Sequence, residues 1–217
     1  MNGISSKKTF IFDFDGTLVN SMPSYSKVMK QVLDEGKIEY GDDLIKIITP
    51  LGYMGTSKYF SELGLKGSID EILEKMLKYL HYEYANVIQE KDKVRKTLLT
   101  MKERGISINV LTASPHVFLD VCLKRLNLFD LFDNVWSCDD FGTGKNNPDI
   151  YKQSAKRIGQ KIGDIVFVDD NVNAVKTAKS AGMISVGIFD ESSKEYVEEM
   201  KLEADEYVYN FEELLVL

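Results

Sequence analysis

The sequence predicts an α/β protein in which a Rossmann-like parallel sheet forms the core and an all-helical cap domain is inserted into it. Two observations lead to this prediction. Short β-prone segments alternate with helical segments in residues 1–19 and 90–217, an order typical of a parallel sheet with right-handed crossovers. Residues 20–89 hold helical patterns and no convincing strand, so we assign them to the cap. The alternative for residues 20–89 is a helical layer packed on the sheet.

The predicted strands are short apolar runs that end at polar residues or glycine. Such runs are typical of strands buried on both faces of a sheet. The first is Thr9–Phe12, which leads into two aspartates and a glycine. The others are Ile106–Leu111, Ile165–Val168 and Ile184–Ile188, with Val135–Trp136 as a weaker candidate.

Helix start and stop signals occupy the intervals between these strands. Serine and proline at 114–115 suit the cap and first position of a helix through Leu126. Asparagine and proline at 147–148 suit the same positions of a helix that Gly159 ends. In the cap, Ser68 and Glu71 form a capping-box pattern, and apolar residues then recur at helical spacing as far as Ile88.

Composition and charge restrict the class of protein. The 217 residues are 44% apolar and 28% charged, which is ordinary for a soluble globular chain. The net charge of −7 and the pI near 5.0 disfavour a nucleic-acid partner, because phosphate backbones attract lysine and arginine. Cys122 and Cys138 lack metal-type spacing, so we expect free thiols in a reducing cytoplasm. Met1–Thr9 does not resemble a signal peptide, and no apolar run is long enough to span a membrane.

Two aspartates follow the first predicted strand. Asp13 and Asp15 are two residues apart, so on an extended segment both side chains point the same way. Two carboxylates about 4 Å apart repel by about 4 kcal/mol at an effective dielectric constant of 20, so the pair indicates a metal ion or a shared proton. Gly16 permits a tight turn and lets its N–H approach an anion. The alternative is a solvated acidic turn.

Polar residues follow other strands, and the carboxyl ends of parallel strands are where ligands bind. The Thr112 hydroxyl, with the N–H groups of Ala113 and Ser114, suits phosphate oxygens, or else forms a simple helix cap. Lys145 suits the offset of phosphate and carboxylate charge, although a lone loop lysine is usually a surface charge. Asp169-Asp170 supplies oxygen ligands for Mg²⁺, or caps the next helix.

This ordered set of motifs resembles the haloacid dehalogenase superfamily of phosphohydrolases over nearly the whole chain. The segment Asp13-Phe14-Asp15-Gly16-Thr17 is similar to its Asp-x-Asp-Gly-Thr signature, and Thr112, Lys145 with Pro148, and Asp170 match the later motifs. The helical insertion resembles the cap of the subfamily of phosphoglycolate phosphatases and β-phosphoglucomutase. Many relatives carry a further aspartate where this chain has Ala174, whereas others pair two aspartates with a downstream asparagine, as Asp169, Asp170 and Asn173 do.

The resemblance implies a role for each site residue. Asp13 is expected to attack phosphorus and form an aspartyl-phosphate, and Asp15 to act as general acid and then base. Mg²⁺ is expected on an Asp13 oxygen, the Asp15 backbone carbonyl and Asp170, with Asp169 as a further candidate ligand. Lys145 offsets negative charge and, with Gly16, Thr112 and Ala113, binds the phosphate.

The resemblance therefore implies a Mg²⁺-dependent phosphatase that hydrolyses a small phosphorylated metabolite of phosphoglycolate or sugar-phosphate type. A phosphosugar mutase is the first alternative, and a non-catalytic phosphate-binding relative is a more remote one. We expect a monomer or weak homodimer without nucleic-acid or membrane partners. The glycine-containing segment Thr49–Gly55 is expected to be either a mobile specificity loop, with Tyr53 contacting the leaving group, or a plain helix–helix turn. His81 and His116 are expected to be structural or surface residues.

Overall fold

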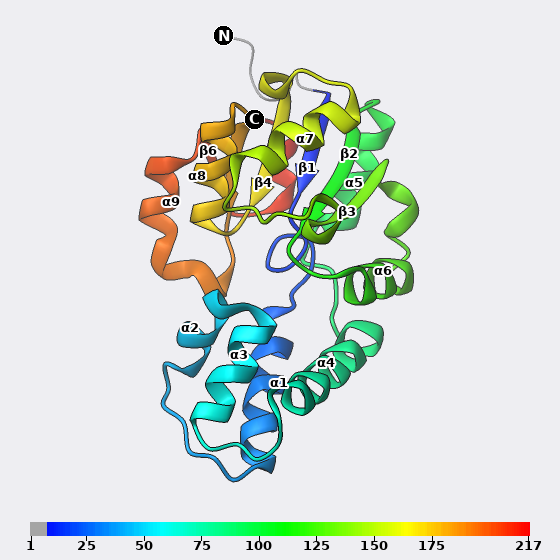
Figure 1. The fold of residues 1–217 in the computed structure, drawn as a ribbon. Helices are drawn as coiled ribbons and strands as arrows, with labels where there is room; N and C mark the ends of the chain where they lie inside the picture. Colours follow the sequence, from blue (N-terminus) through cyan, green and yellow to red (C-terminus); the bar gives the residue numbers. More distant parts are fainter. Residues whose placement is uncertain (1–7) are drawn as a thin grey trace. The chain divides into compact units, whose positions relative to one another are not determined.

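The computed structural model describes residues 8–217, so most of the Met1–Thr9 segment, on which the signal-peptide expectation rests, lies outside the described residues. The core contains a six-stranded sheet with strand order β3-β2-β1-β4-β5-β6, and all its pairings are parallel (Figure 1). The predicted fold class is confirmed. The strands are β1 (Thr9–Phe12), β2 (Ser107–Thr112), β3 (Asn134–Ser137), β4 (Ile165–Asp169), β5 (Ile184–Ile188) and β6 (Glu206–Val208).

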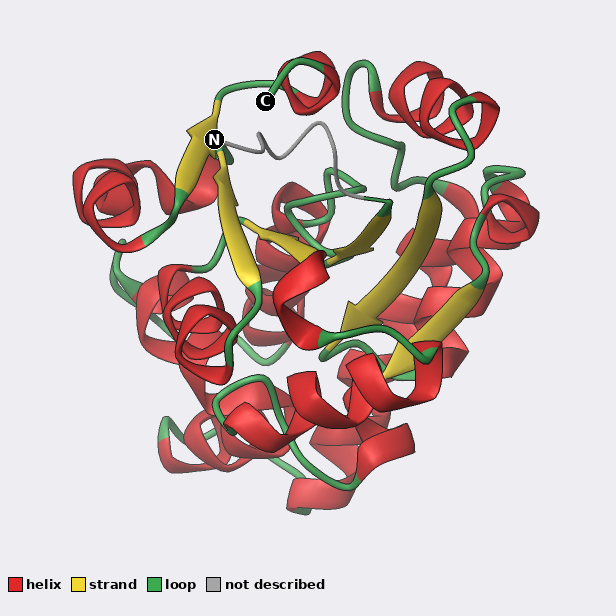
Figure 2. Cartoon of the chain, turned by 90° about the horizontal axis from the view of Figure 1, so that it is seen from above, coloured by secondary structure: helices red, strands yellow, loops and turns green. Residues whose placement is uncertain are grey.

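Helices cover both faces of this sheet (Figure 2). Because side chains alternate along a strand, Ile11 of β1 and Phe167 of β4 belong to a buried apolar cluster with residues of α7 and α8. On the other face the ring of Phe12 stacks on Phe211 with the centroids 5.6 Å apart. The core helices are α5 (Val94–Glu103), α6 (His116–Arg125), α7 (Pro148–Ile158), α8 (Val172–Ala181) and α9 (Val197–Glu203), with 3₁₀ turns η3 (Phe129–Leu131), η4 (Cys138–Phe141), η5 (Ile162–Asp164), η6 (Glu191–Tyr196) and η7 (Phe211–Leu215).

The chain divides into two compact units, one formed by Met1–Asn20 with Gln89–Leu217 and the other by Ser21–Ile88. The second unit is all-helical and is inserted between β1 and β2. It contains α1 (Met22–Glu35), α2 (Leu44–Ile48), η2 (Thr49–Leu51), α3 (Gly52–Glu62) and α4 (Ile69–Asn86). The capping box at Ser68 and Glu71 is present, with both reciprocal hydrogen bonds formed.

A buried charge joins two helices of the inserted unit. Glu83 of α4 is 3% exposed, and its carboxylate accepts hydrogen bonds from the Ser24 hydroxyl and the Lys27 ammonium of α1, each at 2.7 Å. A buried carboxylate is tolerated when it is paired and hydrogen-bonded in this way. The interaction therefore ties α1 to α4 in one register.

Several predicted boundaries are wrong by one or two residues. β2 begins at Ser107 rather than Ile106, because the Ile106 N–H donates to Met101 and completes the end of α5. α6 begins at His116, with Pro115 as its cap and not its first residue. The Ser114 hydroxyl does not cap this helix, because it donates to a carboxylate described below.

Two larger features were left open or missed by the sequence-based expectation. Of the two alternatives for Thr49–Gly55, the structure agrees with the helix–helix turn and not with the loop: the segment forms η2 and the first turn of α3, and the backbone of Gly52, with φ 65°, joins one helical segment to the next. Thr56 and Ser57 are buried and anchor this turn within the unit. The edge strand β6 was not predicted, since its three residues are too few to show an alternating pattern.

The two connections between the units pair with each other. Val19 forms an antiparallel bridge with Glu90, the Asn20 N–H donates to the carbonyl of Gln89, and the Lys91 N–H donates to that of Leu18. The Glu90 carboxylate also accepts two hydrogen bonds from Arg95 of α5. These contacts attach the returning connection to the core.

Both cysteines are free, with Cys122 buried and Cys138 partly buried. Within residues 8–217, the structure has no helix whose length and apolar character would allow it to cross a lipid bilayer.

Candidate active site

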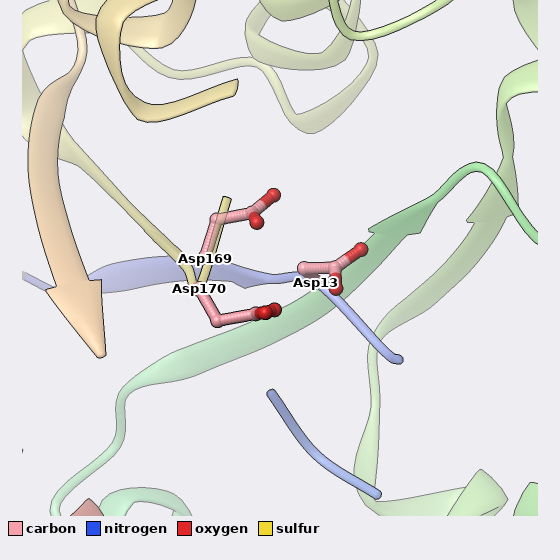
Figure 3. Close-up of side chains that lie close together, drawn as sticks. All are labelled: Asp13, Asp169 and Asp170. Atoms are coloured by element: carbon pink, nitrogen blue, oxygen red, sulfur yellow. The ribbon is translucent and has the colours of Figure 1, made fainter. Parts of the chain in front are cut away.

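The strand order brings two acidic segments together. β1 lies between β2 and β4, and Phe12 is in register with Val168, so the residues that follow β1 meet the end of β4. This is the point at which the strand order reverses, where open parallel sheets bind ligands. Asp13, Asp169 and Asp170 each offer an oxygen atom, and these atoms lie within 4.8 Å of one another (Figure 3).

Lys145 is the cation that faces this acidic cluster. Its ammonium donates to Asp13 Oδ1 at 2.5 Å and to Asp169 Oδ2 at 2.7 Å, and its side chain is only 13% exposed. Although burial alone would lower the pKa of Lys145, the charges of Asp13 and Asp169 hold it well above its ordinary value. Lys145 therefore remains a cation and is not a candidate general base.

The acidic cluster carries more negative charge than Lys145 balances. Burial, with the charges of Asp169 and Asp15, raises the pKa of Asp13 to about 7 against the opposing effect of Lys145. Burial also raises the pKa of Asp170 well above its ordinary value, with Asp169 and Asp13 adding to the rise. Carboxylates that are buried together in this way are stabilised by a cation.

Asp170 is held by a side chain of the loop after β1. The Thr17 hydroxyl donates to Asp170 Oδ1 at 3.1 Å and accepts from the Asp170 N–H at 3.2 Å. The helix cap that the sequence allowed for either the aspartate pair or Asn171 is made by Asn171, which accepts from the N–H groups of Asn173 and Ala174 at the start of α8. Asp169 and Asp170 are thus left for the acidic cluster.

Asp15 lies outside the acidic cluster, and its side chain has a separate partner. The Ser114 hydroxyl donates to Asp15 Oδ2 at 2.5 Å. Ser114 follows β2, and its N–H donates to the Thr112 hydroxyl oxygen at 3.0 Å. The side chain of Asp15 is therefore oriented by the end of β2, whereas Asp13 is oriented by Lys145.

Gly16 has a different role from the one expected of its N–H group. That N–H donates to the carbonyl of Val19 at 3.0 Å and is used within the loop. Glycine is needed for another reason: its φ is 78°, and a Cβ atom would lie 2.7 Å from Asp170 Oδ2. Gly16 thus allows the loop to pack against the acidic cluster.

The remaining phosphate-binding candidates lie beside this loop. Thr112 is the last residue of β2 and is 1% exposed, and Ala113 directly after it is exposed. The end of β2 therefore presents a backbone turn next to the carboxylate of Asp15.

The two positions where the sequence departs from related motifs are not part of the acidic cluster. Ala174 is 5% exposed and packs in the apolar cluster beneath α8, and Asn173 is exposed on that helix. Neither residue supplies a ligand atom to the cluster. The third carboxylate comes instead from the pair Asp169-Asp170.

Sequence reasoning missed the residues that orient the expected site residues. The Tyr151 hydroxyl contacts the backbone carbonyls of Lys145 and Ala174, each at 3.0 Å, and so fastens the loop that carries Lys145. In the sequence Tyr151 is one apolar position of a helix, and no local signal marks its hydroxyl. Ser114 was named from the sequence for its N–H group, which instead donates to the Thr112 hydroxyl oxygen, and the contact of its own hydroxyl with Asp15 was not predicted.

Neither histidine joins the acidic cluster. His116 lies between Asp120 and Asp140, with its two ring nitrogens 2.8 Å from their carboxylates. Hydrogen bonding to Asp120, with a further contribution from Asp140, raises the pKa of His116. His81 is exposed on α4.

This arrangement of a parallel sheet, an inserted helical unit and strand-end aspartates defines a class of hydrolase. Residues 7–182 match the family of haloacid dehalogenase-like hydrolases, and the chain belongs to that family. It is a phosphatase of this family.

Curated relatives match over most of the chain. The chain is 30% identical over 92% of its length to a glyceraldehyde 3-phosphate phosphatase of Methanocaldococcus jannaschii, covering 90% of that protein. It is 27% identical to a phosphoglycolate phosphatase of Colwellia psychrerythraea, with 85% of each chain covered.

Solved structures share the complete fold. A putative β-phosphoglucomutase from Thermotoga maritima superposes with a TM-score of 0.80 at 25% identity, covering 96% of this chain and 97% of that one. The magnesium-bound HAD-hydrolase YfnB of Bacillus subtilis superposes with a TM-score of 0.78 at 16% identity, covering 97% and 99%. The fold of the core with its helical insertion is therefore common to these proteins.

Proposed function

We propose that this protein is a Mg²⁺-dependent phosphatase that hydrolyses a small phosphorylated metabolite of phosphoglycolate or sugar-phosphate type through an aspartyl-phosphate on Asp13. The observation that carries the proposal is the buried contact of Asp13 with Lys145 beside two further carboxylates. The activities of the two named relatives support phosphorylated two- and three-carbon acids and aldehydes as the first substrates to test.

A divalent cation fits the acidic cluster. Three carboxylates offer oxygens within 4.8 Å of one another, and one buried ammonium faces them. Oxygen-only ligand sets suit Mg²⁺, and burial leaves the carboxylates short of positive charge. Asp13 and Asp170, with the backbone carbonyl of Asp15, would hold the ion, and Asp169 is the further candidate. When bound, Mg²⁺ neutralises charge on the phosphoryl oxygens.

Asp13 is the residue best placed to be the nucleophile. Asp13 is 4% exposed, and Lys145 contacts only one of its carboxylate oxygens, Oδ1. The other oxygen, Oδ2, is available to attack phosphorus. The attack joins this oxygen to phosphorus while the bond from phosphorus to the leaving oxygen breaks. Lys145 and the backbone around Thr112 bind the phosphoryl oxygens and hold them for in-line attack.

Asp15 suits proton transfer because it lies outside the acidic cluster and is hydrogen-bonded by Ser114. It gives a proton to the leaving oxygen and then takes one from the water that cleaves the aspartyl-phosphate. Ser114 keeps the side chain in one orientation through both steps.

Replacement of the nucleophile tests the reaction. Asp13→Asn should abolish phosphate release from p-nitrophenyl phosphate while circular dichroism shows a folded protein. Asp149→Asn is the matched control, because Asp149 is an exposed aspartate of the same unit that pairs with Lys152. Full activity in Asp13→Asn would refute the assignment. EDTA should silence the wild type, and Mg²⁺ should restore it.

A screen of phosphorylated metabolites then separates hydrolase from mutase. Release of one phosphate per substrate consumed is the expected result. Isomerised sugar phosphate without net phosphate release would favour the phosphosugar mutase alternative, which the likeness to the putative β-phosphoglucomutase supports. Binding of phosphate compounds without any turnover would favour a non-catalytic relative.

We also propose a cytoplasmic enzyme that is a monomer or weak homodimer and binds neither nucleic acid nor membranes. The two free cysteines and the net charge of −7 support this. Sedimentation at micromolar concentration tests the oligomeric state, and an obligate higher oligomer would contradict the proposal.

A further inference from the structure

Lys91 forms an unusually complete set of hydrogen bonds next to the proposed active site. Its ammonium donates to the carbonyl of Gly16 at 2.6 Å, to the carbonyl of Phe189 at 2.7 Å and to Asp190 Oδ2 at 2.9 Å. A lysine ammonium has three N–H donors, so these contacts use all of them. Lys91 therefore links the loop after β1 to the segment after β5.

Asp190 is itself held in place as a partner for Lys91. Its other carboxylate oxygen accepts from the Ser192 N–H at 2.9 Å and from the Ser192 hydroxyl at 2.5 Å. The carboxylate is 5% exposed, so its interaction with Lys91 is sheltered from solvent. The Lys91 ammonium is thus directed at Gly16 by a fixed anchor.

The contact with Lys91 completes the fixing of the Gly16 backbone. The Gly16 N–H already donates to Val19, so both polar backbone groups of Gly16 have partners. Each peptide unit is planar, so Val19 holds the unit that contains the Asp15 carbonyl and Lys91 holds the next unit. Lys91 thereby limits rotation about the Gly16 Cα that joins the two units. The Asp15 carbonyl is a proposed metal ligand.

We propose that Lys91 is a positioning residue of the active site. Through the Gly16 carbonyl it holds the loop that carries Asp13 and Asp15. It thereby positions the Asp15 carbonyl that would contact Mg²⁺. The inference rests on the proposed function. Partners of metal ligands commonly change metal affinity or activity about 10- to 100-fold when they are removed.

The alternative is that Lys91 only attaches the returning connection to the core. That attachment has other means: the Lys91 N–H donates to Leu18, and Glu90 is held by Arg95. Neither contact involves the Lys91 ammonium. Removal of the ammonium alone should consequently leave the connection in place and expose the effect on the loop.

Lys91→Met keeps the alkyl chain and removes the ammonium. Lys96→Met is the matched control, because Lys96 is an exposed lysine that pairs with Glu212 at 2.7 Å, away from the loop. The probes are Mg²⁺ alone, titrated by calorimetry into the metal-free protein, and hydrolysis of p-nitrophenyl phosphate. We expect Lys91→Met to bind Mg²⁺ about 10-fold more weakly or worse and to lose kcat by at least as much, with little change in KM. Lys96→Met should match the wild type.

Wild-type Mg²⁺ affinity and kcat in folded Lys91→Met would overturn the proposal. Should that variant fail to fold, Asp190→Ala removes the side-chain acceptor that anchors the Lys91 ammonium and should weaken Mg²⁺ binding about threefold. Unchanged binding in folded Asp190→Ala would overturn the proposal equally. Failure of this inference differs from failure of the proposed function. In the first case Asp13→Asn is inactive and Lys91→Met is normal, and in the second Asp13→Asn retains activity.

Discussion

Replacing the proposed nucleophile should make the metal-free protein more stable while it abolishes activity. Burial and the neighbouring carboxylates raise the pKa of Asp13 from 3.8 to about 7. The folded protein therefore holds this proton up to a higher pH than the unfolded chain does. Stability must decline as the pH rises from about 4 to about 7, and the whole cost is present above pH 7. Asp13→Asn removes the carboxylate whose ionisation lowers the stability of the folded protein.

The magnitude follows from the pKa values. One pKa unit corresponds to about 1.4 kcal/mol, so a rise from 3.8 to about 7 costs about 4 kcal/mol at pH 8. At pH 5 the same relation gives about 1.5 to 2 kcal/mol. The stability gained by Asp13→Asn should accordingly be about 2 to 3 kcal/mol larger at pH 8 than at pH 5.

Urea unfolding in EDTA at several pH values between 5 and 8 measures this gain. Asp133→Asn is a control of opposite sign. Although burial raises the pKa of Asp133, hydrogen bonds from Lys102 and Ser107 lower it below its ordinary value. Its carboxylate therefore stabilises the fold at neutral pH, and this stabilisation is lost as the pH falls. A gain for Asp13→Asn that is equal at pH 5 and pH 8, or absent at both, would refute the reasoning.

Three other substitutions test the supporting contacts. Ser114→Ala should lower kcat about tenfold, because a hydrogen bond to a charged group is worth about 1.5 kcal/mol or more. Ser114→Thr keeps the hydroxyl and should retain activity. Equal losses of kcat in the two variants, measured by steady-state kinetics, would show that only packing matters. Tyr151→Phe should destabilise the protein by about 1 kcal/mol in urea, because the Lys145 carbonyl loses a buried donor, and an unchanged midpoint would contradict this. Lys93 caps α5 with φ 65°, so Lys93→Gly should raise stability by about 0.5 kcal/mol in thermal unfolding and Lys93→Ala should not.

The strand-end residues were predictable because a parallel sheet places all its carboxyl ends along one edge. Once β1 and β4 are recognised as parallel strands, Asp13 and Asp170 are expected at the same edge of the sheet. That the two strands are neighbours, which brings the aspartates close together, comes from the structure. Short apolar runs bounded by turn residues were sufficient to identify these two strands. The roles of the individual site residues remain predictions until the variants above are measured.

What the sequence did not reveal depends on contacts between distant segments. Asp169 and Asp170 are adjacent in the chain, yet one pairs with Lys145 and the other with Thr17, because successive side chains leave the backbone in different directions. The contact of Lys91 with Gly16 joins positions 75 residues apart, and nothing local to Lys91 distinguishes it from a surface lysine. The sequence left Thr49–Gly55 open between a loop and a helix–helix turn, because its glycines suit both, and only the structure distinguishes them.

The position of β1 in the sheet has a consequence for how the chain is assembled during synthesis. β1 is synthesised before the other strands of the sheet, but its neighbours are β2 and β4, and β4 ends only at Asp169. The helical unit Ser21–Ile88, by contrast, is continuous in sequence and compact by itself. Local contacts form faster than distant ones, so this unit is able to fold early, whereas β1 cannot complete its pairing until β4 has been synthesised. Until then the apolar residues of β1 lack the two strands that bury them in the folded sheet.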